Sequence, residues 1–352
     1  MDMNKNLKEL LRTYSLPMSV APFLLAFACG VKTPLVFGIL DASFFINAVL
    51  LLIGIILIHL AGNLFDDYID IKSALDDGIS LNQINFKNPK KARLILNKTY
   101  SVKAVEKILI IMLVLAFIIG VYFISQRGFT ILSYMIIALI LCTFYPISSR
   151  YGLSELTLGA IFGPLLINAS YFALTGQFDP KVFFFSIASG VITSILLTAH
   201  SLMDYEYDVE IGKKTIPVIF KNKNLTVNFI SFLILISYFL LTLVSYRYGV
   251  SRLIFIIPIL CTIPVGYKLI MSLYDYIEIK NVQFIPKWYY GIMENFEEIK
   301  KEGFAYFMFR FYLARNLGII FNIALAIVCL FVFVPAQRYD FIHFKFINQF
   351  LF

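Results

Sequence analysis

The chain has 352 residues, of which 60% are hydrophobic and only 15% are charged, and its formal net charge is +8. A soluble protein of this length carries charge on about a quarter of its residues, so the composition and the mean hydropathy of +0.82 exclude an ordinary soluble enzyme. The basic surplus does not indicate nucleic-acid binding, because its distribution along the chain follows the topology of a membrane protein.

The apolar residues form blocks about 20 residues long, which matches the hydrocarbon core of a bilayer at a rise of 1.5 Å per residue. We therefore expect an all-α, polytopic membrane protein that forms a single domain over residues 1–352. The lipid bilayer is its expected environment, and no protein partner can be inferred. Nine spans are predicted, with centres near residues 26, 54, 115, 138, 166, 192, 236, 262 and 323.

The distribution of lysine and arginine predicts the orientation of the spans. With a cytoplasmic N-terminus, the segments on that side carry 20 Lys and Arg residues, whereas the opposite loops and the C-terminal tail carry 7. The positive-inside rule then places the N-terminus and the acidic loops in the cytoplasm. No organelle-targeting pattern is visible, so we expect the plasma membrane of a prokaryote.

The second span continues directly into "NLFDDYIDIKSALDD", residues 63–77, which contains five aspartates. Asn63, Asp66 or Asp67, and Asp70 are three or four residues apart, a spacing that places them on one face of a helix. Such a carboxylate-rich face at a membrane edge indicates a functional site.

The fourth and fifth spans contribute polar and aromatic residues between the two acidic segments. Tyr145 lies near the end of the fourth span, and the fifth contains Asn168, Ser170 and Tyr171. Asn168 and Ser170 could orient a substrate or make hydrogen bonds between helices, and the sequence leaves both interpretations open.

The sixth span ends in a second acidic segment, "HSLMDYEYDVEIGKKTIP", residues 200–217. Asp204 and Asp208 are four residues apart and share a helical face. His200 lies one turn before Asp204 on the same face, either as a site residue or as a hydrogen-bonded helix residue. After a glycine, the segment continues with Lys213 and Lys214.

Residues 275–312, between the last two spans, form an amphipathic, aromatic-rich insert. We expect this insert to lie along the cytoplasmic membrane surface, with Trp288, Tyr289 and Tyr290 at the depth of the lipid headgroups.

Two carboxylate faces at the same membrane depth form an oxygen-rich site that suits Mg²⁺, which typically takes one or two carboxylates, waters and a substrate phosphate. Basic residues in the adjoining loops could bind the same phosphate, and the apolar bundle could hold a lipid tail. An amphiphilic diphosphate fits both properties. The candidate metal ligands are Asp66, Asp67, Asp70, Asp204 and Asp208, and the basic residues are Lys72, Arg93, Lys213 and Lys214.

"NLFDDYIDIKSALD" and "DYEYDVEIGKKTIPV" resemble the two aspartate-rich motifs of the UbiA superfamily of intramembrane prenyltransferases. "LRTYSLPMSVAPFLLA" is similar to the family's first helix, with Arg12 and Pro17 in the expected places. "YGLSELTLGAIFGPLLINASYFALTG" resembles the fifth span of the branch that prenylates dihydroxynaphthoate in menaquinone synthesis. The resemblance covers roughly residues 8–220 and implies nine transmembrane helices around a central cavity.

The resemblance also implies roles for individual residues. Four aspartates are expected to be catalytic and to hold Mg²⁺ and the diphosphate, namely Asp67, Asp70, Asp204 and Asp208. Asn63 and Asp66 are expected to support them. Lys72, Arg93 and Lys213 or Lys214 are expected to contact the phosphates. "HSLMD" departs from the family's usual Asn-Asn-x-Arg-Asp run, and this departure bears mainly on the identity of the acceptor.

The implied reaction is Mg²⁺-dependent ionisation of an isoprenyl diphosphate, followed by capture of the allylic carbocation by an aromatic quinone precursor. The candidate residues of the acceptor or cation pocket are Tyr145, Asn168, Tyr171 and His200. A membrane terpene cyclase is the alternative within the enzyme class, and a divalent-cation or anion transporter is the alternative from another class. Transporters tend to place coupling carboxylates near the midplane, whereas these lie at the ends of spans, which favours an enzyme.

Overall fold

The computed structural model describes residues 3–36, 40–78, 80–81, 92–247, 252–278, 285–294, 296–301 and 305–335. Within these ranges the protein contains no strand, and nine helical segments are long and apolar enough to cross a membrane. Each segment contains one of the nine predicted centres. The prediction of an all-α, polytopic membrane protein is confirmed.

The nine membrane-crossing segments of the described residues are built from ten α-helices, because the fifth segment is broken into two helices. They are α2 (Pro17–Val36), α3 (Ala42–Asp76), α5 (Val102–Arg127), α6 (Phe129–Ser148), the broken pair α7 (Ser154–Ala160) and α8 (Leu166–Thr175), α9 (Pro180–Met203), α12 (Lys223–Arg247), α13 (Ile256–Glu278) and α15 (Ala305–Val332). The short helices are α1 (Met3–Leu10), α4 (Arg93–Leu96), α10 (Tyr205–Glu210), α11 (Ile216–Phe220) and α14 (Phe296–Lys301).

Short polar residues define where several of these helices begin. The Asp41 carboxylate accepts a hydrogen bond from the Phe44 backbone N–H at the start of α3, and Ser101 accepts one from Ala104 at the start of α5. These contacts satisfy N–H groups that have no partner within the helix.

The break in the fifth span is a π-helical turn, Ile161–Leu165, that contains Pro164. Proline lacks the N–H that would continue the α-helical hydrogen bonds, which accounts for the change of geometry at this point. Glycines let this span approach α9 closely. A Cβ atom on Gly163 would lie 2.4 Å from the Gly190 Cα, and one on Gly190 would lie 2.6 Å from the Gly159 carbonyl oxygen.

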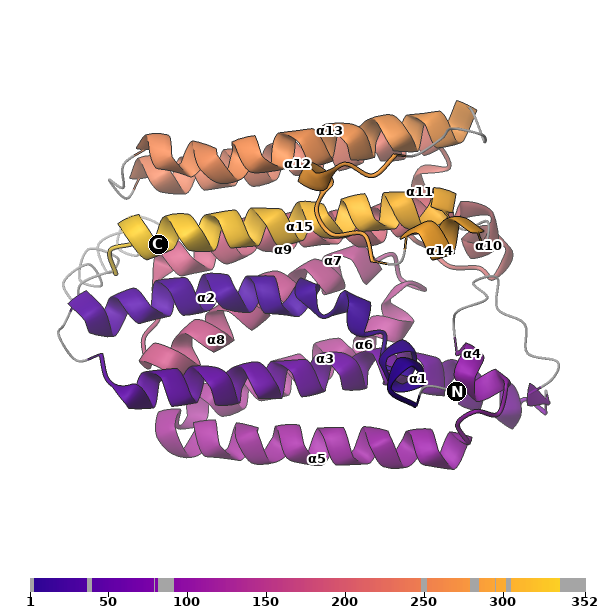
Figure 1. Ribbon diagram of the computed structural model, residues 1–352, viewed down its shortest axis with the longest axis horizontal. Helices are drawn as coiled ribbons and strands as arrows, with labels where there is room; N and C mark the ends of the chain where they lie inside the picture. Colours follow the sequence, from indigo (N-terminus) through magenta and orange to yellow (C-terminus); the bar gives the residue numbers. More distant parts are fainter. Residues whose placement is uncertain are drawn as a thin grey trace, which may run out of the picture.

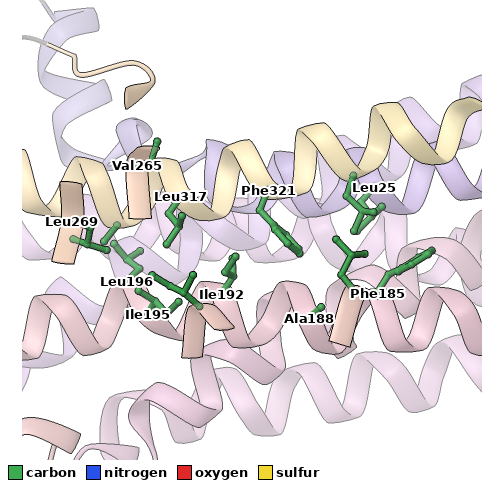
Figure 2. Packing of buried hydrophobic residues seen from close by; sticks show 14 of the residues in the cluster. Leu25, Phe185, Ala188, Ile192, Ile195, Leu196, Val265, Leu269, Leu317 and Phe321 are labelled. Atoms are coloured by element: carbon green, nitrogen blue, oxygen red, sulfur yellow. The ribbon is translucent and has the colours of Figure 1, made fainter. Parts of the chain in front are cut away.

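The long helices run roughly along one common axis, with α12 and α13 on one side of the bundle and α5 on the other (Figure 1). The largest buried core lies between α9 and α15 and includes side chains from α2 and α13. Figure 2 shows Phe185 and Ile192 of α9 facing Phe321 of α15 and Leu25 of α2. By contrast, α5 and α6 expose large apolar side chains on their outer faces, as expected for contact with lipid.

The five short helices gather at the end of the bundle where α3 and α9 finish, on the right of Figure 1. We call this the aspartate end, because both acidic segments lie there. Helix α3 has 35 residues and is about 50 Å long, which exceeds the thickness of the hydrocarbon core. Its last turns, with the first acidic segment, therefore extend beyond the apolar layer.

The connection between the last two spans differs from the predicted insert. Helix α13 continues to Glu278 and α15 begins at Ala305, so the non-spanning part is shorter than residues 275–312. Trp288 is 91% exposed, but Tyr290 is only 6% exposed and packs against Phe309 of α15. Tyr290 is therefore part of the protein core, because the segment folds back onto α15.

Candidate active site

The first acidic group consists of Asp66 and Asp67 near the end of α3, and both contact Arg12. The Arg12 guanidinium hydrogen bonds to the Asp67 carboxylate, and its Nη1 atom lies 3.5 Å from Asp66 Oδ2. Burial lowers the pKa of Arg12, but the neighbouring Asp67 and Asp66 outweigh this effect and leave the pKa raised. Arg12 thus neutralises part of the crowded acidic group.

Arg12 lies in a short turn that α3 holds in place. The Asn63 side chain donates to the Leu11 carbonyl oxygen (3.3 Å) and to Ser15 Oγ (2.9 Å). Ser15 Oγ in turn donates to the Arg12 carbonyl oxygen (2.8 Å) and lies 2.7 Å from His59 Nε2. Asn63 therefore fastens the turn that carries Arg12, and its direct contact with a diphosphate stays a prediction.

The second acidic group consists of Asp204 and Asp208 at the junction of α9 and α10. Lys213 Nζ lies 3.7 Å from Asp208 Oδ1, and the Thr215 hydroxyl donates to Asp208 Oδ2 (3.2 Å). Burial raises the pKa of the Asp208 carboxyl, although Lys213 and Thr215 act in the opposite direction. His200 Nδ1 lies 3.4 Å from Asp204 Oδ2, so the predicted one-turn spacing brings these two side chains together.

Glu155 holds the loop that contains Lys213 and Thr215. Its side chain is buried at the start of α7, with Oε1 accepting from the Ile216 backbone N–H (3.0 Å) and Oε2 accepting from the Ser154 hydroxyl (2.8 Å). Neither Glu155 nor Thr215 was a predicted site residue. An acidic residue at the start of an apolar span is the signal by which the sequence could have identified Glu155.

The segments that carry the two acidic groups' neighbours pack against one ring of α15. The Phe311 ring lies 6.1 Å from the Tyr14 ring and 6.2 Å from the His200 ring. The beginning of α2, the end of α9 and α15 therefore meet at the aspartate end.

A small cavity, with room for about one water molecule, lies between α2, α9 and α15. Most of its lining is apolar, and Arg315, Thr193 and Asn322 add a few polar groups. Pro17 and Arg315 line the part of the cavity next to the turn that carries Arg12. This cavity alone does not hold a prenyl chain.

The four predicted pocket residues divide into two sets. His200 lies at the aspartate end, and Tyr145 interacts electrostatically with Asp66 and Arg12. Tyr171 lies at the opposite end of the bundle, where its hydroxyl is 3.0 Å from Thr33 Oγ1 near the end of α2.

Asn168 also lies away from the aspartates. It hydrogen bonds to Ser186 Oγ of α9 (2.8 Å) and to the Pro164 carbonyl oxygen (2.6 Å). It therefore makes the contact between helices that the sequence left open as its alternative role. The structure does not bring Asn168 and Tyr171 to the acidic groups.

The predicted phosphate-binding residues also differ in their surroundings. Lys72 pairs with Asp76 (3.2 Å), and both side chains are more than half exposed. Lys214 is exposed, and its backbone N–H donates to the Ser149 carbonyl oxygen (2.7 Å). Arg93 begins α4, but its side chain lies outside the described residues. Asp70 lies one turn beyond Asp66 on α3 and is half-buried.

The donor chemistry of the two acidic groups fits Mg²⁺. Among the described residues, no three His, Cys, Asp or Glu side chains form a ready-made metal site. Magnesium, however, is usually bound by one or two carboxylates together with substrate phosphates and water, and seldom by a cage of protein ligands. Carboxylates from α3 on one side and from the α9–α10 junction on the other suit an ion that is shared with a diphosphate.

Comparison with known proteins adds independent findings. The profile of the UbiA prenyltransferase family matches residues 19–283. The 1,4-dihydroxy-2-naphthoate octaprenyltransferase of Haemophilus influenzae is 25% identical over 180 residues, which cover 48% of this chain and 56% of that protein. The match to this curated relative thus spans only about half of its length.

The fold is similar to two solved structures. One is a UbiA homologue from Aeropyrum pernix K1, with a TM-score of 0.55 and 14% identity over 87% of this chain and 95% of that one. The other is a UbiA homologue from Archaeoglobus fulgidus bound to GPP and Mg²⁺, with a TM-score of 0.54 and 15% identity over 91% and 99%. At these identities the similarity shows that the fold is shared.

Proposed function

The chain belongs to the UbiA prenyltransferase family, and from this premise we propose that it is a prenyltransferase that transfers a prenyl group from an isoprenyl diphosphate to an aromatic quinone precursor within the membrane. The observation that carries the proposal is the presence of two acidic groups, each beside its own basic residue, at one end of an apolar helical bundle. Asp66 and Asp67 lie beside Arg12, and Asp208 lies beside Lys213.

The donor in this proposal is divided between two environments. Its prenyl chain lies among the apolar side chains of the bundle next to the aspartate end, and its diphosphate lies between the two acidic groups. Mg²⁺, held by these aspartates, would supply positive charge that stabilises the departing diphosphate. Lys213 and Arg12 are close enough to the aspartates to bind the phosphate oxygens as well. The A. fulgidus relative, bound to GPP and Mg²⁺, supports this assignment.

The chemistry proceeds by breaking the bond between C1 of the prenyl chain and the diphosphate oxygen, which keeps the electron pair. The allylic cation then bonds to an electron-rich aromatic carbon, and that carbon loses its proton to the released diphosphate or to water. His200 and Tyr145 are the predicted pocket residues that lie beside the acidic groups, so we place the acceptor near them. The H. influenzae dihydroxynaphthoate enzyme supports an acceptor of this kind.

The membrane location follows from the fold and from the charge distribution. Nine apolar helices among the described residues support an integral membrane protein. The excess of Lys and Arg on the side of the acidic loops supports a cytoplasmic aspartate end in a prokaryotic plasma membrane. This orientation would give the site access to water-soluble Mg²⁺ and release diphosphate into the cytoplasm.

The test uses purified protein in lipid nanodiscs, labelled isoprenyl diphosphates of increasing chain length, and dihydroxynaphthoate or other phenols as acceptors. We expect a prenylated product that requires Mg²⁺ and that Asp67→Asn and Asp208→Asn abolish. Asp41→Asn is the matched control, because Asp41 is an exposed aspartate at the other end of α3. If diphosphate is released and a cyclic hydrocarbon forms, the protein is a cyclase and not a transferase. If no donor releases diphosphate, the proposal is refuted.

A further inference from the structure

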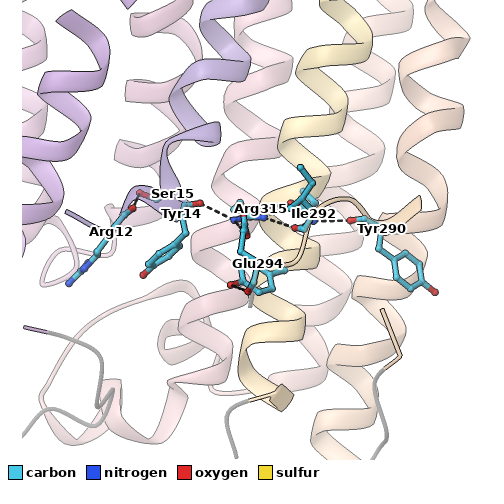
Figure 3. Close-up of polar contacts among 9 residues, drawn as sticks. Arg12, Tyr14, Ser15, Tyr290, Ile292, Glu294 and Arg315 are labelled. Atoms are coloured by element: carbon cyan, nitrogen blue, oxygen red, sulfur yellow. Dashed lines mark hydrogen bonds and ion pairs between the residues drawn. The ribbon is translucent and has the colours of Figure 1, made fainter. Parts of the chain in front are cut away.

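Arg315 is a charged residue inside the membrane-spanning helix α15, and its side chain is only 1% exposed. A buried charge in a span is costly unless it is paired and hydrogen bonded. Its Nη1 atom donates to the Tyr14 carbonyl oxygen and to the Glu294 carboxylate, both at 2.8 Å, and Nη2 donates to the Ile292 carbonyl oxygen at 2.6 Å (Figure 3). The Arg315 side chain therefore joins α15 to residues 292–294 and to the turn that contains Tyr14, which is 301 residues away.

The segment that Arg315 holds, residues 290–294, is docked closely on α15. The Asn316 side chain donates to the carbonyl oxygens of Tyr290 (2.8 Å) and Ile292 (2.9 Å). Gly291 between them has a φ of 84°, and a Cβ atom there would lie 2.8 Å from Asn316 Nδ2. This close approach requires glycine, which indicates a specific docking of the segment.

Tyr312 completes the docking, since its hydroxyl donates to the Glu294 carbonyl oxygen (2.9 Å). Its ring also faces the Arg315 guanidinium, with 4.6 Å between the ring centroid and Cζ. We call the contacts of Tyr312, Arg315 and Asn316 with residues 290–294 and Tyr14 the Arg315 latch. The latch fixes both the connection between the last two spans and the backbone of the turn before the first span.

The turn that the latch fixes is the one that carries Arg12. The Tyr14 carbonyl is two residues from Arg12, and Ser15 Oγ donates to the Arg12 carbonyl oxygen. Arg12 has a φ of 50°, in the left-handed region that residues other than glycine adopt only when their surroundings hold them there. Asn63 of α3 holds the turn on one side, and Arg315 of α15 holds it on another.

We propose that Arg315 is a positioning residue of the prenyl-transfer site, which sets the Arg12 guanidinium against Asp66 and Asp67 by holding the Tyr14 carbonyl. The inference rests on the proposed function, because it assigns Arg315 to the binding of the donor diphosphate. All four donor hydrogens of the two terminal nitrogens serve protein acceptors (Tyr14, Glu294, Ile292 and Asn316), so Arg315 acts through Arg12 and does not itself contact the donor.

The test measures the Kd of geranyl diphosphate with Mg²⁺ for the wild type, Arg315→Lys and Glu294→Gln in nanodiscs. Lysine keeps the charge but loses the planar fork that reaches several acceptors at once. We expect Kd to rise about tenfold for Arg315→Lys, as for the loss of a hydrogen bond to a charged group. Two controls should leave Kd unchanged. Arg127→Lys alters an arginine that donates to the Ala173 and Leu174 carbonyl oxygens, and Trp288→Ala alters the same connection at an exposed position.

A double-mutant cycle separates positioning from a general loss of stability. If Arg315 acts through Arg12, then Arg315→Lys should raise Kd much less in an Arg12→Lys background than in the wild type. Equal effects in both backgrounds would overturn the inference. If Arg315→Lys does not fold, Glu294→Gln decides the question, because the Glu294 side chain is 35% exposed and tolerates change more readily.

The same experiment distinguishes the two proposals. Wild-type protein that does not bind geranyl diphosphate would refute the proposed function and the inference with it. Wild-type protein that binds, together with folded Arg315→Lys and Glu294→Gln variants whose Kd is unchanged, would refute only the role of the latch.

Discussion

Arg12 and Asp67 are 55 residues apart in the sequence and in direct contact in the structure. The Asp67 side chain is only 4% exposed, and the Arg12 guanidinium offsets part of its buried charge. The contact joins the turn before the first span to the end of the second, which places a basic residue inside the first acidic group. The pair should therefore affect both the free energy of unfolding and the binding of the diphosphate.

Removal of Arg12 should destabilise the protein, because Asp67 would be left buried without its partner. We expect Arg12→Ala to lower the free energy of unfolding by about 3 kcal/mol. Lys72→Ala is the control, since the Lys72–Asp76 pair is largely exposed and such pairs contribute about 0–1 kcal/mol. Thermal unfolding of both variants in detergent measures the difference, and equal effects would contradict the importance of the buried pair.

The buried carboxyl of Asp208 should make the stability of the metal-free protein depend on pH. Burial raises its pKa in the folded state, so the folded protein binds this proton more tightly than the unfolded chain does. The resulting destabilisation is complete above the folded-state pKa and disappears as the pH falls to the ordinary value near 3.8.

Asp208→Asn should therefore stabilise the protein at neutral pH in EDTA, and this gain should vanish in acid. Thermal unfolding of the wild type and the variant, measured from about pH 4 to about pH 8, tests this expectation. A gain that is independent of pH would show that the carboxyl ionises normally in the folded state.

Glu155 should support activity although it lies outside both aspartate motifs. Glu155→Ala leaves the Ile216 N–H without its acceptor, which should cost about 2 kcal/mol, and it loosens the loop that carries Lys213 and Thr215. Glu155→Gln keeps an oxygen acceptor and should retain most of the activity. Initial rates and unfolding temperatures of the two variants provide the comparison, and full activity of Glu155→Ala would count against a role in holding the loop.

The close packing of α7 and α9 should make Gly190 sensitive to the addition of a single methyl group. The new Cβ of Gly190→Ala would meet the Gly159 carbonyl oxygen at 2.6 Å, and a backbone atom cannot move away cheaply. We expect a loss of about 2 kcal/mol or more. Gly62→Ala in α3 is the control, since no atom lies within 4 Å of its new Cβ, and it should be neutral or stabilising. Equal unfolding temperatures would refute the close contact.

The nine spans and the two acidic faces could be predicted because each depends on local sequence. Span length is set by the bilayer, and a spacing of three or four residues determines which helical side chains share a face. The position of Tyr171 also follows from local geometry, since it is 16 residues beyond Glu155 on the same span and about 24 Å along a helix. That distance carries it away from the aspartate end, which the prediction did not take into account.

The roles of Arg12 and Arg315 could not be predicted in the same way, because they depend on contacts between distant parts of the chain. Arg315 reaches a carbonyl group 301 residues away, and no spacing rule connects the two. The presence of an arginine inside the last span was a visible signal of function, but only the packing of α15 against α2 identifies its partner.

The hydrogen bond from Arg315 to Tyr14 also has a consequence for biosynthesis. Chains are made from the N-terminus, so the turn that carries Arg12 emerges before α15, which follows the other spans of the described residues. Both acidic groups are already present when α9 and α10 have been made, yet the arginine of the first group receives its final support only from α15. The site is therefore completed only once α15 has been inserted, well after both acidic groups have been made.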